Sequence, residues 1–239
     1  MKKWIAILLA GLTVCAYAEE AQKANEDHRI YFEPDFSWNL AHKYNFEGQS
    51  LKEWGQYYGL NVGYEFFRPN FIYAGVDGFL SVGNRFLELK TQQQQTFDAK
   101  MQSSRNRIEG RLGYTLQHGP FILVPFTGSG GYFISQGDEE LNVAYIPIGI
   151  QGEYRWSQFS IGLKGEQMHY VHSWRTFGDE VESANAWAPG SFGYEVALPI
   201  SFRTNGSGGE WFAAFEPYYL RLFDDFSFLG GRISASHQF

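Results

Sequence analysis

Ten stretches of this chain alternate apolar with polar or small side chains at a period of two. Within residues 72–82, Val76, Leu80 and Val82 share one face and Asp77 lies on the other. Successive side chains of a β-strand point to opposite faces, so this period predicts strands. A strand that crosses a bilayer needs about 9–11 residues. The pattern therefore predicts an all-β fold, either a soluble sandwich or a transmembrane barrel, since both show the same period.

The ten predicted strands extend over most of the chain. They cover residues 29–38, 57–66, 72–82, 107–116, 121–135, 145–156, 159–166, 192–203, 211–223 and 232–239. The stretch 121–135 carries no charge, so its faces cannot be assigned. In 211–223, an inward Glu216 sends Arg221 outward unless a β-bulge near Pro217 corrects the phase. Without a bulge, Arg221 belongs at the outer rim, where charge is tolerated.

The lengths of the connections favour a barrel over a sandwich. Alternate links are short and rich in Pro, Gly, Asn and Ser, at 68–70, 118–120, 157–158 and 205–210. The other links are predicted at 39–56, 85–106, 137–142, 178–190 and 224–225, and three of these are long. Short inner turns and long outer loops are typical of outer-membrane barrels. We predict an antiparallel up-and-down transmembrane β-barrel of about ten strands, with both termini in the periplasm.

The first 18 residues have the form of a secretory signal peptide. Lys2 and Lys3 precede an apolar run that is too short to span a bilayer, and small residues then lead to Ala18. We expect cleavage near Ala18. The predicted organisation is a signal peptide at 1–18, a short periplasmic segment at 19–28 and a barrel domain at 29–239.

Charge and cysteine content exclude several classes of function. Cleavage would remove 2 of the 19 basic residues, none of the 26 acidic ones and the single cysteine. The mature charge of about −9 argues against nucleic-acid binding. No thiolate metal site or disulfide remains for the mature chain, and the sequence predicts neither a cofactor nor a metal. The acidic run 138–140 is interpreted as a solvated loop rather than a calcium site.

The end of the chain carries a further signal. The last strand runs to Phe239, on the lipid-facing parity where an aromatic girdle is expected. With the signal peptide and the period-two strands, this resembles the small outer-membrane barrels of Gram-negative bacteria. OmpA-like barrels, ten-stranded Opc-like adhesins and omptin proteases are the nearest architectures. In that class the terminal aromatic is read by the barrel-assembly machinery, so the resemblance implies that Phe239 is an assembly signal.

The inward faces of the predicted strands collect charged residues. They are Glu33, Asp35, Glu65, Asp77, Arg107, Glu109, Arg111, Glu153, Arg155, Lys164, Glu166, Glu195, Arg203, Glu216 and Arg232. Charges in a confined interior are expected to pair, because an unpaired buried ion is strongly destabilising. On this basis Arg111→Ala should destabilise the barrel more than Arg105→Ala, since Arg105 falls in the predicted loop 85–106.

Barrel size sets the two leading interpretations of that lumen. Eight strands are just filled by side chains, whereas 16–18 leave an aqueous channel, so ten strands lie near the filled end. A salt-bridged lumen in a structural or surface-interaction protein is the favoured interpretation. The alternative is a narrow, weakly cation-selective, porin-like channel, because the predicted lumen is more acidic than basic.

An outer-membrane hydrolase is the third interpretation. His169, His172, Ser173 and Glu166 cluster near the top of one strand. On a regular strand His169 and Ser173 share a face but lie about 13 Å apart, too far for a nucleophile and its base. Lipid A deacylases carry a His-x-Ser on the lipid face, and omptins need paired aspartates and an Asp-His pair. The sequence departs from both patterns, so no catalytic residue is predicted.

The predicted outer loops are where a specific partner would bind. Tyr44, Phe46 and Trp54 in 39–56, and Trp187 in 178–190, are candidate anchors for an extracellular ligand, as in adhesins, or for packing on the barrel rim. Residues 89–106 are polar and are expected to extend two strands as a hairpin. Outer-membrane lipids, including lipopolysaccharide, and the assembly machinery are the other predicted partners.

Overall fold

The computed structural model describes residues 27–46, 49–91, 96–137, 139–177, 180–184, 192–206, 209–222 and 226–238. Within these ranges the regular structure is β, and no helix there is long and apolar enough to cross a bilayer. The strands are β1 (Asp27–Phe46), β2 (Gln49–Phe67), β3 (Ile72–Lys90), β4 (Thr96–Tyr114), β5 (Leu116–His118), β6 (Phe121–Gln136), β7 (Glu139–Arg155), β8 (Phe159–Phe177), β9 (Glu180–Ala184), β10 (Phe192–Ala197), β11 (Ile200–Gly206), β12 (Gly209–Leu222) and β13 (Phe226–Gln238).

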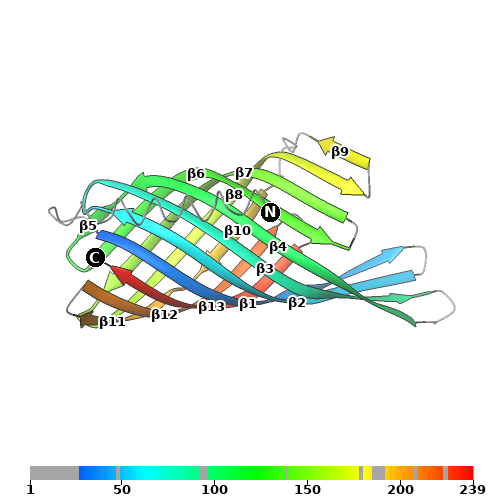
Figure 1. Ribbon diagram of the computed structural model, residues 1–239, viewed down its shortest axis with the longest axis horizontal. Helices are drawn as coiled ribbons and strands as arrows, with labels where there is room; N and C mark the ends of the chain where they lie inside the picture. The colour runs from blue at the N-terminus through cyan, green and yellow to red at the C-terminus, as the bar shows by residue number, and fades with distance from the viewer. Residues whose placement is uncertain are drawn as a thin grey trace.

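These strands form one closed antiparallel barrel (Figure 1). Sequence neighbours pair around the ring, and β13 pairs with both β12 and β1, so the sheet has no edge along the wall. In two places, a pair of short strands together makes up one of the ten strands of the barrel wall. β4 and β5 keep one register against β6, and β10 and β11 keep one register against β8 and β12. The prediction of ten antiparallel strands in a closed barrel is confirmed.

The break between β10 and β11 has a local cause. Pro199 has no backbone N–H and cannot donate to the ladder. Its carbonyl still accepts from the Gly162 N–H at 2.8 Å, and the Leu198 N–H donates to the Pro217 carbonyl at 3.0 Å. The wall therefore remains continuous where the regular pairing is interrupted.

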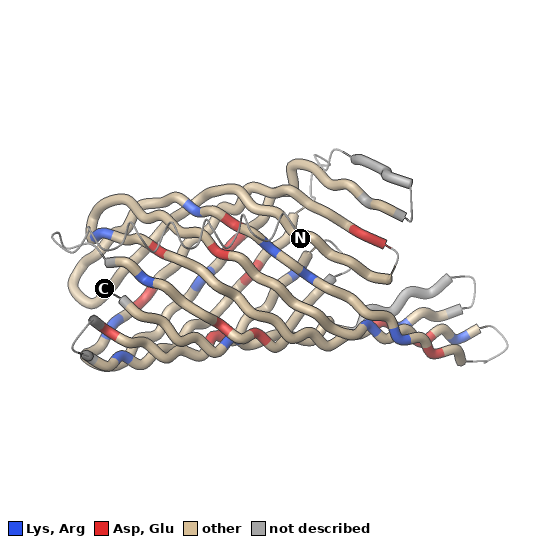
Figure 2. Tube along the Cα trace, in the orientation of Figure 1, with Lys and Arg blue, Asp and Glu red and all other residues tan. Residues whose placement is uncertain are grey.

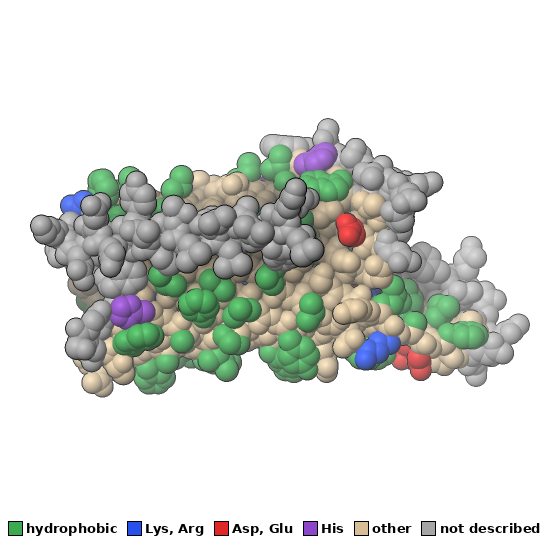
Figure 3. All heavy atoms as spheres, in the orientation of Figure 1, with side chains coloured by type: hydrophobic (Ala, Val, Ile, Leu, Met, Phe, Trp, Pro, Cys, Tyr) green, Lys and Arg blue, Asp and Glu red, His purple; other side chains and the backbone are tan. Residues whose placement is uncertain are grey.

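The two faces of the wall differ as the alternation predicts. On β3, Val82 is 60% exposed while its neighbour Ser81 is buried. On β4, Leu112 is 63% exposed while Arg111 is buried. Figure 3 shows apolar side chains spread over the outer surface of the barrel. Figure 2 marks the charged positions along the strands of the wall, and many of these side chains are buried, such as Asp77, Arg107 and Glu195. This barrel has a polar interior and an apolar exterior.

Aromatic rings border the apolar exterior at both ends. At the end with the short turns, Tyr154, Trp156, Phe159 and Phe202 form a chain of ring contacts with centroids 4.6 to 5.3 Å apart. At the other end, the Phe36 ring lies 4.0 Å from Trp38 and 4.9 Å from Tyr58. Between these rings, no outward position of the described strands carries Asp, Glu, Lys or Arg. We call this region the apolar band.

Two β-bulges lie in the upper part of the barrel wall. The β1–β2 register shifts between Asn39 and His42, and the β7–β8 register shifts at Ala144/Tyr145. Bulges are frequent at barrel rims because they bend a strand and end regular pairing. Of the two alternatives for residues 211–223, a β-bulge near Pro217 is excluded, since the β12–β13 register runs unbroken from Glu210 to Leu222. Arg221 therefore points outward near the rim, as the alternative required.

Beyond this rim, strands replace much of the predicted loops. The ranges 39–56 and 85–106 were expected as loops, but β1–β2 pairing continues to Phe46↔Gln49 and β3–β4 pairing to Lys90↔Thr96. The extension of 89–106 as a hairpin is confirmed. Figure 1 shows these two hairpins projecting together from one end of the barrel, apart from the β8–β9 hairpin. The upper parts of β1 to β4 form a four-stranded sheet outside the barrel.

Glycines on the inward face create room for the large rings of the lumen. Tyr31 lies directly across from Gly63, Tyr145 from Gly130 and Tyr218 from Gly230. A Cβ added at any of these glycines would overlap the facing tyrosine ring. The ring lies flat over the neighbouring strand instead of projecting across the lumen, so this ring–glycine pairing lets bulky residues line a narrow barrel.

Candidate functional site

The lumen is crossed by a network of ion pairs. Arg107 donates to Asp77 Oδ1 at 2.7 Å, and Arg111 donates to Asp77 Oδ2 at 2.8 Å. Arg111 also lies 3.4 Å from Glu109, whose other oxygen accepts from the Tyr145 hydroxyl at 2.6 Å. All these side chains are buried. Because β3 and β4 supply the charges and β7 supplies the tyrosine, the network ties one wall of the barrel together.

Glu195 connects that wall to the opposite one. It comes from β10, is fully buried, and faces three cations. Its distances are 2.9 Å to Arg232, 3.3 Å to Arg107 and 3.9 Å to Lys164. Lys164 is also 3.5 Å from Glu166. A carboxylate held by cations from three different strands crosslinks the barrel through its centre.

Arg232 extends the network across the seam where the barrel closes. It lies on β13 and donates to Glu216 of β12 at 2.6 Å. It also approaches Asp35 of β1 at 3.5 Å, and the Asp35 carboxylate lies 3.9 Å from Arg105. The seam between the first and last strands is thus held by side chains as well as by backbone pairing.

The structure places all 15 predicted lumen charges on the inward parity, with different partners. The central network brings together Asp35, Glu65, Asp77, Arg107, Glu109, Arg111, Lys164, Glu166, Glu195, Glu216 and Arg232. The others lie toward the short-turn end. Glu153 pairs with Arg155 at 3.0 Å, Arg203 with Glu210 at 3.4 Å, and Glu33 accepts from Asn61 at 2.7 Å.

Arg105 is the main lumen residue that the sequence reasoning missed. It was placed in a loop, but it is 2% exposed and lies inside the barrel. Its guanidinium lies 4.2 Å from the Phe228 ring centroid and 5.0 Å from that of Phe79, and it donates to the Tyr218 hydroxyl at 3.3 Å. The signal was present, since Arg105 shares the parity of Arg107. The expectation that Arg105 lies in a loop is wrong, because it lies within β4 (Thr96–Tyr114).

The outer half of the lumen is filled by aromatic and aliphatic side chains rather than by charge. This outer layer consists of Tyr57, Tyr132, Ile134, Val143, Tyr145, Met168, Tyr170, Ala197, Tyr218, Leu220, Leu222 and Phe228. The uncharged strand 121–135 contributes Tyr132 and Ile134, which explains why its faces could not be assigned. At the rim above this layer, Arg85 bonds to Glu53 and to Gln136. The charges that were predicted to fill the lumen are therefore concentrated in the inner half, where a smaller apolar cluster of Phe67, Tyr73, Ile122, Val124 and Phe126 also lies.

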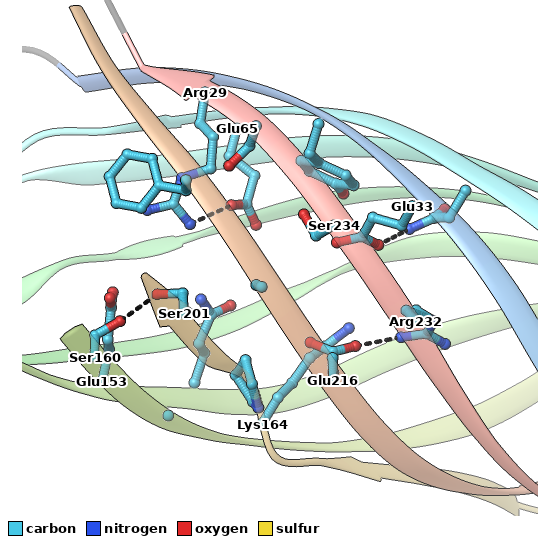
Figure 4. Close-up of a pocket in the computed structure, with 18 of the residues that line it drawn as sticks. Arg29, Glu33, Glu65, Glu153, Ser160, Lys164, Ser201, Glu216, Arg232 and Ser234 are labelled. Atoms are coloured by element: carbon cyan, nitrogen blue, oxygen red, sulfur yellow. Dashed lines mark hydrogen bonds and ion pairs between the residues drawn. The ribbon is translucent and has the colours of Figure 1, made fainter. Parts of the chain in front are cut away.

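A cavity of about 110 Å³ opens below the network, at the short-turn end. Its lining includes Arg29, Glu33, Glu65, Ser160, Lys164 and Arg232, which Figure 4 labels. Ser160 and Ser201 are bonded at 2.5 Å across its wall. This volume has room for several waters. The cavity is a polar vestibule whose lining includes Arg107, Arg111 and Arg232 of the ion-pair network.

The bulge in β8 places residues of the predicted hydrolase cluster on opposite faces of the wall. His169 faces outward beside Ile146 and Phe192, whereas Ser173 pairs with the buried Val143. The expectation that His169 and Ser173 share a face is wrong, because the extra residue at the bulge reverses the parity. His172 lies next to the Trp174 ring and off the parity of Glu166. Among the described residues no group of three or more His, Cys, Asp or Glu is placed to hold a metal.

Three of the four predicted anchor residues lie in strands, and the fourth anchor and the predicted terminal signals lie outside the described residues. Tyr44 and Phe46 fall in β1 and Trp54 in β2, so these three are strand positions rather than loop positions. Trp54 stacks on Phe86 with centroids 5.7 Å apart. Trp187, Phe239 and residues 1–26, with the predicted cleavage at Ala18, lie outside the described residues. In the acidic run 138–140, Glu139 and Glu140 begin β7, and the first position is not described.

No protein-family model matches the sequence, and the search of curated proteins finds no relative. Among solved structures, the chain is similar to the outer membrane protease OmpT from Escherichia coli, with 10% identity over 90% of this chain and 97% of that chain and a TM-score of 0.53. An outer-membrane channel from Pseudomonas putida F1 matches with 8% identity over 90% of this chain and 96% of that one, at a TM-score of 0.43.

Ail, the attachment invasion locus protein of Yersinia pestis, matches with 11% identity over 90% of this chain and 100% of that one, at a TM-score of 0.35. At these identities a likeness concerns the fold alone, and only the OmpT match is close enough to support it. The structural neighbours are outer-membrane β-barrels, which agrees with the barrel seen here.

Proposed function

We propose that this chain is an integral outer-membrane β-barrel with a closed lumen, which serves as a scaffold for the hairpins that project from its outer end. After signal-peptide cleavage near Ala18, the barrel inserts with both termini in the periplasm and the hairpins outside the cell. Its partners are outer-membrane lipids, the barrel-assembly machinery and an extracellular ligand of the hairpins. The single observation that supports a closed lumen is that ion pairs and aromatic rings pack continuously across it.

The apolar band supports the membrane part of the proposal. Its outward side chains are uncharged on every described crossing, and aromatic rings border it at both ends, as in transmembrane barrels. On β3 it runs from Ile72 to Val82, which fits the length of a tilted transmembrane strand. A soluble barrel would expose these apolar side chains to water over a contiguous surface, which soluble monomers avoid.

Two successive barriers support a closed lumen. Glu195, Arg107 and Arg232 meet across the barrel at distances of 2.9 to 3.3 Å. Above them, the outer layer is one cluster of buried side chains that come from β2, β6, β7, β8, β10, β12 and β13. We expect these two barriers to exclude a hydrated ion, so the barrel should not conduct.

Planar-bilayer recording of the purified, refolded protein tests this. The wild type should show no steady conductance. The double variant Arg107→Ala/Glu195→Ala removes one positive and one negative charge, and it weakens the inner barrier only. It should also show no steady conductance, because the outer layer remains. A steady conductance in the wild type would instead support the narrow channel, for which the polar vestibule is the favouring observation. The reversal potential in a salt gradient would then test its predicted weak cation selectivity.

A hydrolase is the third candidate, since the similar OmpT is a protease and the likeness reaches no further than the fold. We propose no catalysis, because the Ser173 and His169 side chains lie on opposite faces of the wall. Incubating the purified protein with lipid and peptide substrates tests this, and turnover that survives Ser173→Ala and His169→Ala together would point to another nucleophile.

A further inference from the structure

The outward face of the projecting sheet carries an ordered set of cross-strand rows above the apolar band. The top row of the band is Tyr58, Val82 and Ser104. Above it lies an amide row, Gln56, Asn84 and Gln102, and then a row of Trp54, Phe86 and Lys100. A fourth row holds Lys52, Glu88 and Asp98. Polarity therefore changes from apolar through amide to aromatic and cationic with distance from the band.

The aromatic row forms a flat platform flanked by two cations. The Trp54 and Phe86 rings are nearly parallel, with an interplanar angle of 17°. The Lys52 ammonium lies 5.1 Å from the Trp54 ring centroid, and the Lys100 ammonium lies 5.9 Å from that of Phe86. Both lysines are exposed. Their contacts with the rings leave ammonium donors directed to solvent, where they are available to an anion.

The two acidic residues on this face are placed differently. Glu88 is 3.0 Å from Lys90, so its charge is compensated. Asp98 lies at the far side of the fourth row, on the strand that ends the sheet. The lower part of the face, with its amides, rings and Lys100, therefore carries net positive charge next to the apolar band.

The height of these rows matches a lipid headgroup. Positions two apart on one strand are about 7 Å apart, so Trp54 lies about 13 Å along the strand from Tyr58. With a strand tilt of 35–45°, that is about 10 Å along the bilayer normal. The interfacial layer on each side of a bilayer is about 5–8 Å thick. The amide row lies within that layer, and the platform lies at its outer surface, at the level of a sugar headgroup.

We propose that this face binds the phosphorylated sugar headgroup of a glycolipid in the outer leaflet, of the lipopolysaccharide type. The acyl chains lie on the apolar band, the amides bond sugar hydroxyls, the rings stack on a sugar face, and Lys52 and Lys100 bind phosphate. The inference rests on the proposed membrane insertion. It names one site for a lipid partner and requires no change in the barrel.

Native mass spectrometry of the full-length mature protein in detergent tests the site. The probe is rough-type lipopolysaccharide, titrated while the fraction of folded protein with one bound molecule is measured. Each lysine near an anionic lipid contributes about a fivefold gain in affinity. Lys52→Gln/Lys100→Gln should therefore weaken binding roughly 25-fold. Removing the phosphates from the glycolipid should weaken binding by the wild type to the same level.

Arg68→Gln is the matched control. Arg68 is also an exposed cation over a ring, 5.1 Å from the Phe71 centroid, but it lies at the short-turn end, where no outer-leaflet lipid reaches. It should bind as the wild type does. Equal affinity for the double variant and the wild type would overturn the proposal. Equal affinity of the wild type for the acyl-free core oligosaccharide would also overturn it, since the site would then serve soluble glycans.

Insertion into phosphatidylcholine vesicles, followed by heat-modifiable gel mobility, separates this inference from the proposed function. Failure of the wild type to insert would contradict the membrane proposal itself. Normal insertion together with unselective lipid binding would contradict the glycolipid site alone.

Discussion

Arg105 lies in the part of the lumen where aromatic rings dominate. Its guanidinium is enclosed by Phe79, Phe228 and Tyr57, and its nearest carboxylate, on Asp35, is 3.9 Å away. A buried cation needs such compensation, because removing a charge from water is strongly unfavourable. Arg105 therefore connects the ion pairs of the inner half to the rings of the outer half.

We expect Arg105→Ala to lower the free energy of unfolding by about 3 kcal/mol, close to the effect of Arg111→Ala. The change removes the packed cation and leaves Asp35 with Arg232 alone. Arg68→Ala, at an exposed position, should change stability by less than about 0.5 kcal/mol. Urea unfolding from lipid vesicles measures all three. If Arg105→Ala proved as mild as Arg68→Ala, Arg105 would not contribute to the packing.

At the scale of elements, adjacent strands fit together through the ring–glycine pairs. The prediction is that Gly63→Ala and Gly230→Ala each destabilise the barrel by about 1–3 kcal/mol, because the new methyl group displaces a facing tyrosine ring. Gly78→Ala is the control, since its added Cβ meets nothing within 4 Å. Thermal unfolding followed by gel mobility reports the difference. Equal midpoints for all three variants would show that the rings move aside freely.

Strand direction, face and order were predictable because the apolar exterior and the polar lumen impose opposite polarities on alternate residues. The upper parts of β1 to β4 project beyond the barrel, where the two faces no longer differ in polarity. They carry polar residues on both faces, and for this reason the sequence pattern was interpreted as loops. The pairing of Asp35 with Arg232 could not be predicted, since it depends on register between strands distant in sequence. The parity of residues 171–177 was missed because nothing in the sequence signals the bulge.

The closing strand gives a prediction at the end of the chain. Gln238 pairs with Arg29 on one side and Glu210 on the other, and Phe239 follows it outside the described residues. Deleting Phe239 should impair assembly into the outer membrane but not secretion across the inner membrane, and Phe239→Tyr should restore most of it. Heat-modifiable mobility of outer-membrane fractions reports assembly. Normal assembly of the deletion variant would remove any role for this residue.

The whole molecule has two unlike ends, one with short turns and one with projecting hairpins. We expect tags inserted near Gln93 and Ala184 to be labelled on intact cells. A tag at Gly119, in the tight turn before β6, should be labelled only after permeabilisation. The physical reason is that short turns face the periplasm in transmembrane barrels. Labelling of Gly119 alone on intact cells would invert the orientation.

The pairing of β1 with β13 has a consequence for the time course of folding. Arg29 and Gln238 are almost the full length of the described chain apart, yet they are cross-strand neighbours. Such a non-local contact forms slowly, because the entropy of closing the loop is lost before the contact contributes. Until the last strand is synthesised, β1 keeps an unpaired edge that favours aggregation. We therefore expect the polypeptide to be kept unfolded until its last strand is available, and the barrel to complete its fold only when β13 pairs with β1.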